Sequence, residues 1–290
     1  MTTHPTSSST PTATAEQLLA AGELSATLMA LQQQVRKQPG DVRLRTFLFQ
    51  LLAVLEQWER AASQLKLCGE LDAGTLAMVS TYREALQCEA VRQAVMTGRT
   101  TPMVFGEPAP WIGLLTEALA VEAKGEVAAA AALRRQALEE APTTAGTLNG
   151  TPFEWIADAD SRLGPVLEVV LRGRYGWLPL SQVSRIVVEP PADLRDLVWM
   201  PAHLFLPNGG ESVALIPTRY TGPDLGAYVD TVHNDALLLA RRTDWHALAP
   251  EQAPEQYRGS GQRVLTSSGP ELGLLDVREL VLHLPPAEAA

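Results

Sequence analysis

The acidic residues that could do chemistry are concentrated in one short segment. Glu154, Asp158, Asp160 and Arg162 lie close together in a stretch, residues 153–171, whose pattern predicts a helix. Glu154 and Asp158 would share a face of that helix because they are four residues apart. Two carboxylates on one face could bind a divalent metal ion or act as a general acid and base.

A structural role explains these charges more simply. Asp158 and Arg162 are also four residues apart, so we expect them to pair with each other near a junction between two domains. A similar cluster contains Asp193, Arg195 and Asp196, and Asp193 is typical of a helix cap or turn residue. Ion pairing is therefore the favoured interpretation of both clusters.

Established catalytic templates do not occur in the chain. It has no phosphate-binding loop that ends in Gly-Lys-Ser/Thr and no dinucleotide-binding glycine fingerprint. Gly259-Ser260-Gly261 is not preceded by the apolar strand that a nucleophile elbow needs. The five histidines show no pair at helical metal-ligand spacing, and Cys68 and Cys88 suit small hydrophobic residues on helices. We therefore expect no enzyme activity, no catalytic residue, no cofactor and no metal site.

Composition excludes further classes. The 290 residues carry a formal net charge of −10, which disfavours nucleic acid or an anionic membrane as a partner. No stretch approaches the roughly 20 apolar residues of a membrane span. Residues 1–14 are rich in Ser, Thr and Pro, which predicts a disordered tail rather than a signal peptide. The expected location is cytoplasmic.

Residues 15–145 are predicted to be helical and to contain degenerate repeats. From Gly22, Gln57 and Gly125, an alanine follows after four residues, an apolar residue after eight and a helix breaker after seventeen. The starting points are 35 and 68 residues apart, close to one and two periods of about 34 residues. This spacing predicts a domain of repeats similar to tetratricopeptide (TPR) repeats, with an open groove.

Individual helices can also be placed. Asp41 is available to cap a helix after the Pro39-Gly40 breaker, and a long helix is expected over residues 75–96. The proline-rich run 98–110 predicts a loop that either packs on the protein or is recognised by a partner, and packing of its Phe105 on the helices is the favoured interpretation. Two further helices are expected over residues 111–121 and 127–138.

Residues 146–290 are predicted to form an α+β domain with a mostly antiparallel sheet. Residues 183–188 form a β-branched run, and Asn208-Gly209 supplies the turn of a hairpin. Pro201 and Pro217 indicate sheet edges or bulges. A helix is expected over residues 230–243 and two last strands over 263–266 and 277–282. The fold class is therefore α followed by α+β.

Several segments together resemble the ImpE family, also called SciE or TagJ, of accessory proteins of bacterial type VI secretion. The likeness extends over about residues 15–284. The segments that carry it are Phe47-Leu48-Phe49-Gln50-Leu51-Leu52, Gln57-Trp58-Glu59-Arg60-Ala61, Thr101-Pro102-Met103-Val104-Phe105-Gly106, residues 152–165 around Trp155, residues 193–202 around Trp199, and Asn208-Gly209-Gly210-Glu211.

The resemblance implies a role beside the contractile sheath. It implies binding to the N-terminal helix of the small sheath subunit and a link to the AAA+ unfoldase that recycles the sheath, and it implies no catalytic residues. A helical-repeat groove commonly accepts an amphipathic helix through its apolar face. We therefore expect helices within residues 44–82 to line the groove, with Phe47, Phe49, Trp58 and Tyr82 as partner-binding anchors.

Two other classes of function stay open. One is a helical-repeat interaction module outside secretion. The other is a metal-dependent enzyme that uses Glu154, Asp158 and Asp160. Trp177 and Trp199 could anchor an interface, although core packing is the favoured role of both.

Overall fold

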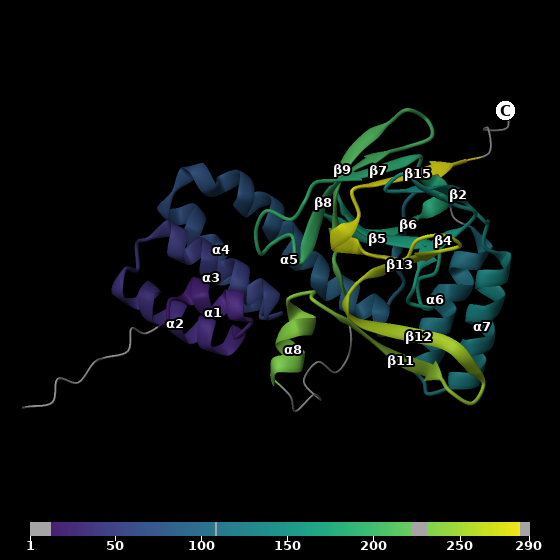
Figure 1. Cartoon of the computed structure of the whole chain (residues 1–290), viewed down its shortest axis with the longest axis horizontal. Helices are drawn as coiled ribbons and strands as arrows, with labels where there is room; N and C mark the ends of the chain where they lie inside the picture. Colours follow the sequence, from purple (N-terminus) through teal and green to yellow (C-terminus); the bar gives the residue numbers. More distant parts are fainter. Residues whose placement is uncertain (1–12, 108, 222–230, 285–290) are drawn as a thin grey trace, which may run out of the picture.

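A computed structural model describes residues 13–107, 109–221 and 231–284 (Figure 1). Most of the predicted tail and the segment before the predicted helix at 230–243 lie outside these ranges. Helices come first along the chain and strands later, so the predicted fold class is confirmed at this level. The helices are α1 Ala15–Ala21, α2 Leu24–Lys37, α3 Val42–Val54, α4 Trp58–Leu71, α5 Leu76–Met96, α6 Pro110–Glu122, α7 Val127–Glu140 and α8 Thr231–Leu238.

The largest sheet is mostly antiparallel, with the order β1-β6-β5-β9-β8-β7-β15-β2-β3, and β1 pairs with β6 in parallel. Two smaller sheets have the orders β10-β12-β11 and β14-β13-β4. The strands are β1 Met103–Val104, β2 Ala145–Leu148, β3 Thr151–Phe153, β4 Ile156–Asp158, β5 Val166–Leu171, β6 Arg174–Pro179, β7 Arg185–Val188, β8 Trp199–Phe205, β9 Glu211–Pro217, β10 Arg219–Tyr220, β11 Thr243–Ala249, β12 Ala253–Gln262, β13 Val264–Ser267, β14 Leu272–Gly273 and β15 Glu279–His283.

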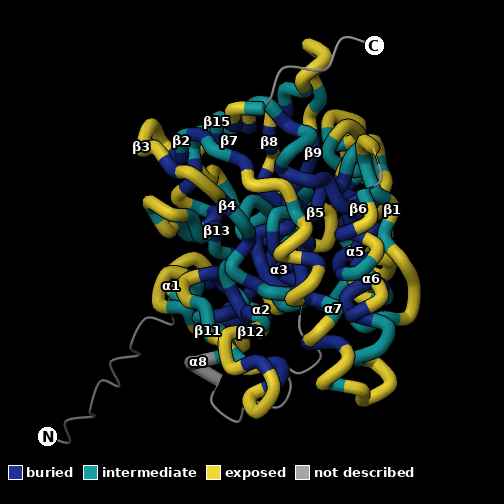
Figure 2. The backbone as a smooth tube through the Cα atoms, turned by 90° about the vertical axis from the view of Figure 1, so that its right-hand side faces the viewer, coloured by how far each residue is buried: buried dark blue, intermediate teal, exposed yellow. Residues whose placement is uncertain are grey.

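The helices α1 to α4 lie at one end of the molecule and the sheets at the other, with α5 running between them (Figure 1). The tube in Figure 2 shows buried backbone running through both parts. One hydrophobic cluster contains residues of α1 to α6 together with Val166, Trp177 and Trp199 of the sheet. One hydrophobic core therefore contains residues from both sides of the predicted domain boundary between residues 145 and 146. A division into two domains at this point stays a prediction.

The first two helical hairpins and the third lie apart. The pairs α1–α2, α3–α4 and α6–α7 pack against each other, and α7 also contacts the β11–β12 ribbon. The three repeat segments correspond to the second helix of each pair. Of their alanines, however, only Ala61 is buried, whereas Ala26 is half-buried and Ala129 is exposed. A TPR-like stack is therefore not confirmed.

The prediction of a helix over residues 153–171 is wrong. The chain forms β3, β4 and β5 there. Gly164 has a positive φ of 58° and is followed by Pro165, which interrupts any helix at that point. The run after Pro165 contains Val166, Val169 and Val170, whose β-branched side chains favour a strand.

Two smaller predictions also need correction. Pro201 and Pro217 lie on β8 and β9 in the interior of the sheet, not at its edge. Both are accommodated at ladder ends, because Pro201 lies one residue beyond the last β7–β8 pair and Pro217 ends β9. Phe105 packs against the hydrophobic cluster of the sheet rather than on the helices, because β1 aligns its segment beside β6.

Asp41 caps α3, as the sequence predicts. Its side chain accepts hydrogen bonds from the backbone N–H groups of Arg43 (2.8 Å) and Leu44 (3.2 Å). We expect Asp41→Ala to lower the free energy of unfolding by about 1 kcal/mol, whereas Asp41→Asn keeps an acceptor and costs less. Urea denaturation of both variants measures this, and equal losses would contradict the capping role.

Candidate functional site

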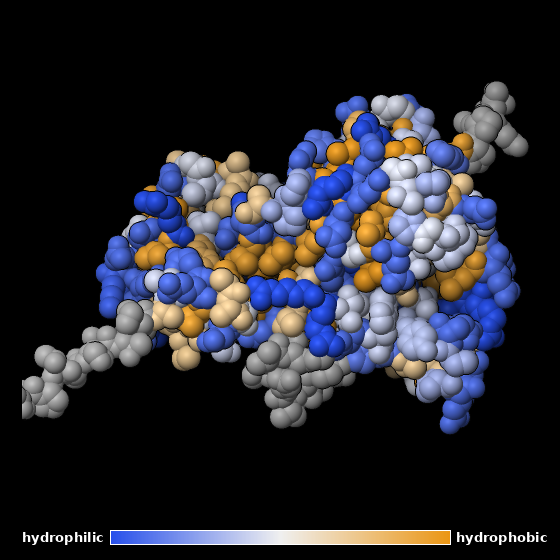
Figure 3. Space-filling model, in the orientation of Figure 1, coloured by the Kyte–Doolittle hydropathy of each residue, from blue (hydrophilic) through white to orange (hydrophobic). Residues whose placement is uncertain are grey.

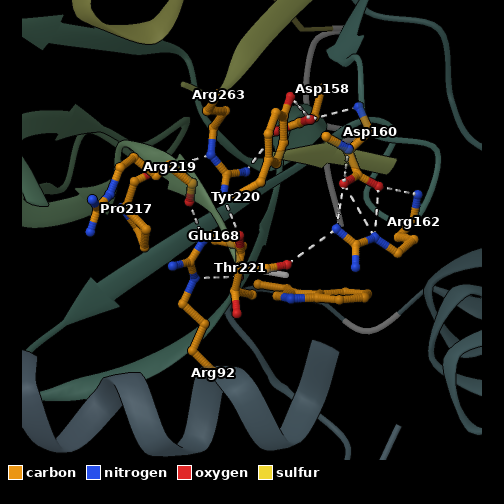
Figure 4. Close-up of polar contacts among 12 residues, drawn as sticks. Arg92, Asp158, Asp160, Arg162, Glu168, Pro217, Arg219, Tyr220, Thr221 and Arg263 are labelled. Carbon is orange, nitrogen blue, oxygen red and sulfur yellow. Dashed lines mark hydrogen bonds and ion pairs between the residues drawn. The ribbon is translucent and has the colours of Figure 1, made fainter. Parts of the chain in front are cut away.

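Buried charges gather where α5 meets the sheets, and Glu168 lies at their centre (Figure 4). Arg92 of α5 donates to Glu168 from Nε (3.0 Å) and Nη2 (3.1 Å). Arg263, which follows β12, donates from Nη2 to the same Glu168 Oε2 that accepts from Arg92 Nη2, and the Tyr175 hydroxyl donates to Glu168 Oε1. All of these side chains are buried, so water does little to screen the attraction between their opposite charges.

Asp158 belongs to the same network, because Arg263 donates to both Glu168 and Asp158. Its carboxylate accepts hydrogen bonds from Arg263 Nη1 (2.6 Å), the Tyr220 hydroxyl (2.8 Å) and the backbone N–H of Asp160 (2.9 Å). Asp160 pairs with Arg162 at 2.6 Å. The predicted Asp158–Arg162 pair is therefore wrong: with no helix here, each of the two finds a different partner.

The network also ties the helices to the sheet. Trp199 Nε1 of β8 donates to Glu89 Oε1 of α5 at 2.7 Å, and Glu89 forms an ion pair with Arg92. Arg219 of β10 donates to the Val54 carbonyl at the end of α3 (2.8 Å). These contacts join segments that are far apart in sequence, so the cluster fixes the orientation of the two halves.

The surroundings of Glu168 and Asp158 shift their pKa values in opposite directions. Burial alone would raise the pKa of Glu168, but Arg92 and Arg263 outweigh it and hold the pKa below its usual range. Burial dominates at Asp158 and raises its pKa to about 6, with Arg263 opposing the shift. Burial also raises the pKa of Tyr220 well above its ordinary value, so its hydroxyl remains a donor.

The structure does not assemble the three carboxylates of the enzyme hypothesis. Asp158 and Asp160 are buried in ion pairs, while Glu154 is exposed and its backbone N–H donates to Ser268 Oγ (2.7 Å). Among the described residues, no group of three or more His, Cys, Asp and Glu could hold a metal ion. What the arrangement does chemically is neutralise buried charge.

The cysteines behave as the sequence predicts. Cys68 and Cys88 are both buried and free. Burial raises the pKa of Cys88 to about 11, so the thiol stays protonated and unreactive near neutral pH.

In the described residues, no helix is long and apolar enough to cross a membrane.

Two of the four predicted anchors lie in the core. Phe49 is 0% exposed and Tyr82 7% exposed, and their rings are 5.9 Å apart. The Trp199 ring packs against two of these helical residues, with ring centroids 5.9 Å from Tyr82 and 5.8 Å from Trp58. The sheet half therefore fills the inner side of these helices, and Phe49 and Tyr82 offer a partner no surface in this conformation.

The other two anchors are only partly buried. Phe47 belongs to a row at helical spacing, together with Leu44 and Leu51 of α3 and with Leu55, which caps the C-terminus of that helix. Leu51 is buried, but Leu44, Phe47 and Leu55 each keep some exposed surface. Figure 3 shows apolar residues as a band across this face, over α3. We call Leu44, Phe47 and Leu55 the α3 apolar row.

Sequence reasoning missed most of the charged network. Arg92, Glu168 and Arg263 are separated by 76 and 95 residues, which no local spacing rule covers. One signal was present, since Glu168 interrupts an otherwise aliphatic run. A charge within a buried strand requires a partner of opposite charge.

Comparison with known proteins places the chain among described relatives. A family model described as ImpE protein matches residues 150–281. The type VI secretion system accessory component TagJ of Pseudomonas aeruginosa is 50% identical over 268 residues, which cover 92% of this chain and 90% of that protein. The crystal structure of protein VPA1032 from Vibrio parahaemolyticus has the same fold, with a TM-score of 0.82 at 23% identity over 95% of this chain and 99% of that one.

Proposed function

The chain belongs to the ImpE family, and on that premise we propose that it is a non-enzymatic accessory protein of type VI secretion that binds the N-terminal helix of the small sheath subunit. An accessory role in type VI secretion agrees with the name of its relative from Pseudomonas aeruginosa. The further part of the proposal is that the same protein links the sheath subunit to the AAA+ unfoldase that recycles the sheath.

The observation that carries this proposal is the α3 apolar row. Leu44, Phe47 and Leu55 pack inward on the core and keep an outer surface. An amphipathic helix binds such a surface with its own apolar residues at spacings of three and four. The net charge of −10 favours a guest helix with Lys or Arg on its flanks, which speeds association more than it strengthens binding.

The paired network supports a binding role over a catalytic one. Enzyme sites place reactive groups with shifted pKa values in a cleft that substrate can reach. Here Glu168 and Asp158 do have shifted pKa values, but both are enclosed and bonded to arginines. Their shifts are accounted for by a structural ion-pair network.

Capture of the small sheath subunit by a Phe47→Glu variant tests the proposed site. We expect the captured amount to fall about tenfold or more, since a charge in an apolar contact centre removes a hot spot. Val213→Glu is the matched control, because Val213 is apolar and 59% exposed but lies on β9 of the sheet. Circular dichroism checks that both variants fold. Equal capture by the two variants would remove the α3 row as the binding surface.

The link to the unfoldase has a separate test. Immobilised sheath subunit should retain more AAA+ unfoldase when this protein is added, and the Phe47→Glu variant should abolish the gain. Retention that does not change on addition of the protein would leave it a sheath-subunit binder alone.

A further inference from the structure

Exposed aromatic side chains gather on a part of the molecule that the proposed function does not use. Trp155, Trp245 and Tyr257 are 41%, 40% and 40% exposed. Trp245 and Tyr257 come from the β11–β12 ribbon, and Trp155 immediately precedes β4. Exposed aromatic residues at a monomer surface are typical of contact sites for other polypeptides.

Strand β4 places these residues around two hollows. Burial alternates along β4 and the two residues after it: Ile156, Asp158 and Asp160 are buried, while Ala157 and Ala159 are partly exposed. The Ala159 N–H donates to the Val264 carbonyl (3.0 Å), so the pairing with β13 continues by one hydrogen bond past the end of β4, before the chain bends. Ala157 lines one hollow and Ala159 the other. The Cα atoms of residues two apart in the chain are separated by at most about 7 Å, so the hollows are neighbours.

The hollow beside Ala159 suits a cation. Its volume is about 260 Å³, and it is lined by Ala159, Trp245, Tyr257 and Glu271, which we call the aromatic notch. This is smaller than usual for a small-molecule site, about 300–1,000 Å³, but it suits one side chain. Among the lining residues the only charge is the Glu271 carboxylate. An aromatic face attracts an ammonium or guanidinium group, and a carboxylate pairs with it.

The notch is held in shape by the network beneath it. Trp245 packs against the Tyr220 ring, with centroids 5.7 Å apart. The Tyr220 hydroxyl is fixed by its hydrogen bond to Asp158. Gly259 faces Trp245 across the ribbon, and a Cβ there would lie 2.2 Å from the Tyr220 ring. The rings are therefore positioned before any guest arrives, which lowers the entropy cost of binding.

The nearest arginine of the ribbon does not compete for the notch. Arg258 adjoins Tyr257 in β12, so its side chain leaves from the opposite face of the strand. There it lines a different hollow, together with Arg162.

The hollow beside Ala157 is apolar. Its volume is about 270 Å³, and its lining includes Leu138, Pro142, Trp155 and Ile156. It carries no charged lining residue. This hollow suits an apolar side chain, such as leucine, of an extended guest polypeptide. The side chain two residues further along that guest would then reach the aromatic notch.

We propose that the aromatic notch and the Trp155 hollow together bind an extended segment of a partner polypeptide, with an Arg or Lys side chain between Trp245, Tyr257 and Glu271 and an apolar side chain beside Trp155. This surface lies on the sheet half and is separate from the α3 apolar row. It does not rest on the proposed function, because loss of sheath-subunit binding would leave it unchanged.

Nuclear magnetic resonance of the tryptophan indole N–H groups in the full chain tests the proposal. The probes are capped, glycine-flanked peptides that contain Leu-Gly-Arg or Arg-Gly-Leu, and the control peptide carries citrulline, a neutral analogue of arginine. We expect one arginine peptide to shift the Trp245 and Trp155 signals with a dissociation constant of about 1 mM or weaker. The citrulline peptide should leave the Trp245 signal in place, and the buried Trp177 and Trp199 serve as internal references.

Variants separate the two contributions. Glu271→Gln should weaken binding of the arginine peptide about two- to fivefold, the effect expected for loss of an exposed ion pair. Added salt should weaken binding of this peptide to the unmodified protein, because it screens the pair. Trp155→Ala should weaken binding of the arginine peptide, because the leucine side chain loses its contact. The preference for the arginine peptide over the citrulline peptide should stay. A Trp245 signal that does not move with either arginine peptide, or that moves equally with the citrulline peptide, would overturn the proposal.

Discussion

Glu168→Gln is expected to lower the free energy of unfolding by about 3–5 kcal/mol, because removing one member of a buried ion-pair network leaves the others uncompensated. Glutamine keeps the shape of the side chain but not its charge. Arg92 and Arg263, both buried, would then share one fewer carboxylate. Chemical denaturation followed by circular dichroism measures the difference.

Glu279→Gln is the matched control for this variant. Glu279 also pairs with an arginine, Arg185, at 2.6 Å, but the two side chains are 38% and 48% exposed. An exposed pair contributes about 1 kcal/mol or less. If the two variants lost the same stability, the buried network would not have the role that we assign to it.

The effect of Glu168 should also depend on pH. Its pKa is lower in the folded chain than the ordinary value of 4.5. A depressed carboxyl pKa stabilises the folded state above the ordinary value, and this contribution is lost as the pH falls below it. The stability difference between the unmodified protein and Glu168→Gln should therefore be full near pH 7 and shrink below about pH 4.5.

Trp199→Ala is expected to cost about 3–5 kcal/mol, the usual range for truncating a large buried aromatic residue. Trp199 is fully buried and contacts Trp58 and Tyr82 of the helical half. Its indole also donates to Glu89, which would lose that partner. Thermal unfolding measures the loss as a lowered Tm.

Trp155→Ala is the control, since Trp155 is 41% exposed. Trp199→Phe should fall between the two, because it keeps a ring in the core but removes the indole donor. A Trp199→Ala variant as stable as Trp155→Ala would show that the contact between the two halves does not limit stability.

Local signals predicted the elements whose causes are local. Asp41 caps α3 because a carboxylate one residue before a helix accepts its free N–H groups. The predicted turn between β8 and β9 forms with Gly209 at a positive φ of 80°, a conformation that glycine adopts without strain, while Asn208 does not have a positive φ. The α-then-α+β order followed from these patterns.

Most features that sequence reasoning missed depend on contacts between distant residues, such as the pairing of Asp158 with Arg263 across 105 residues. The helix expected over residues 153–171 is an exception, because Gly164-Pro165 and the β-branched residues after it already favour a strand locally. Phe49 and Tyr82 looked like open groove residues because no local signal indicates that Trp199 packs on Tyr82, or that the Tyr82 ring packs on Phe49. The aromatic notch is likewise formed by three separate segments.

Isothermal titration calorimetry of the full chain with the purified small sheath subunit is the decisive experiment for the proposed function. We expect one-to-one binding to the intact subunit, loss of binding when the subunit lacks its N-terminal helix, and at least about tenfold weaker binding by Phe47→Glu. Binding that survives deletion of that helix, or no binding to the intact subunit, would rule out the proposed function.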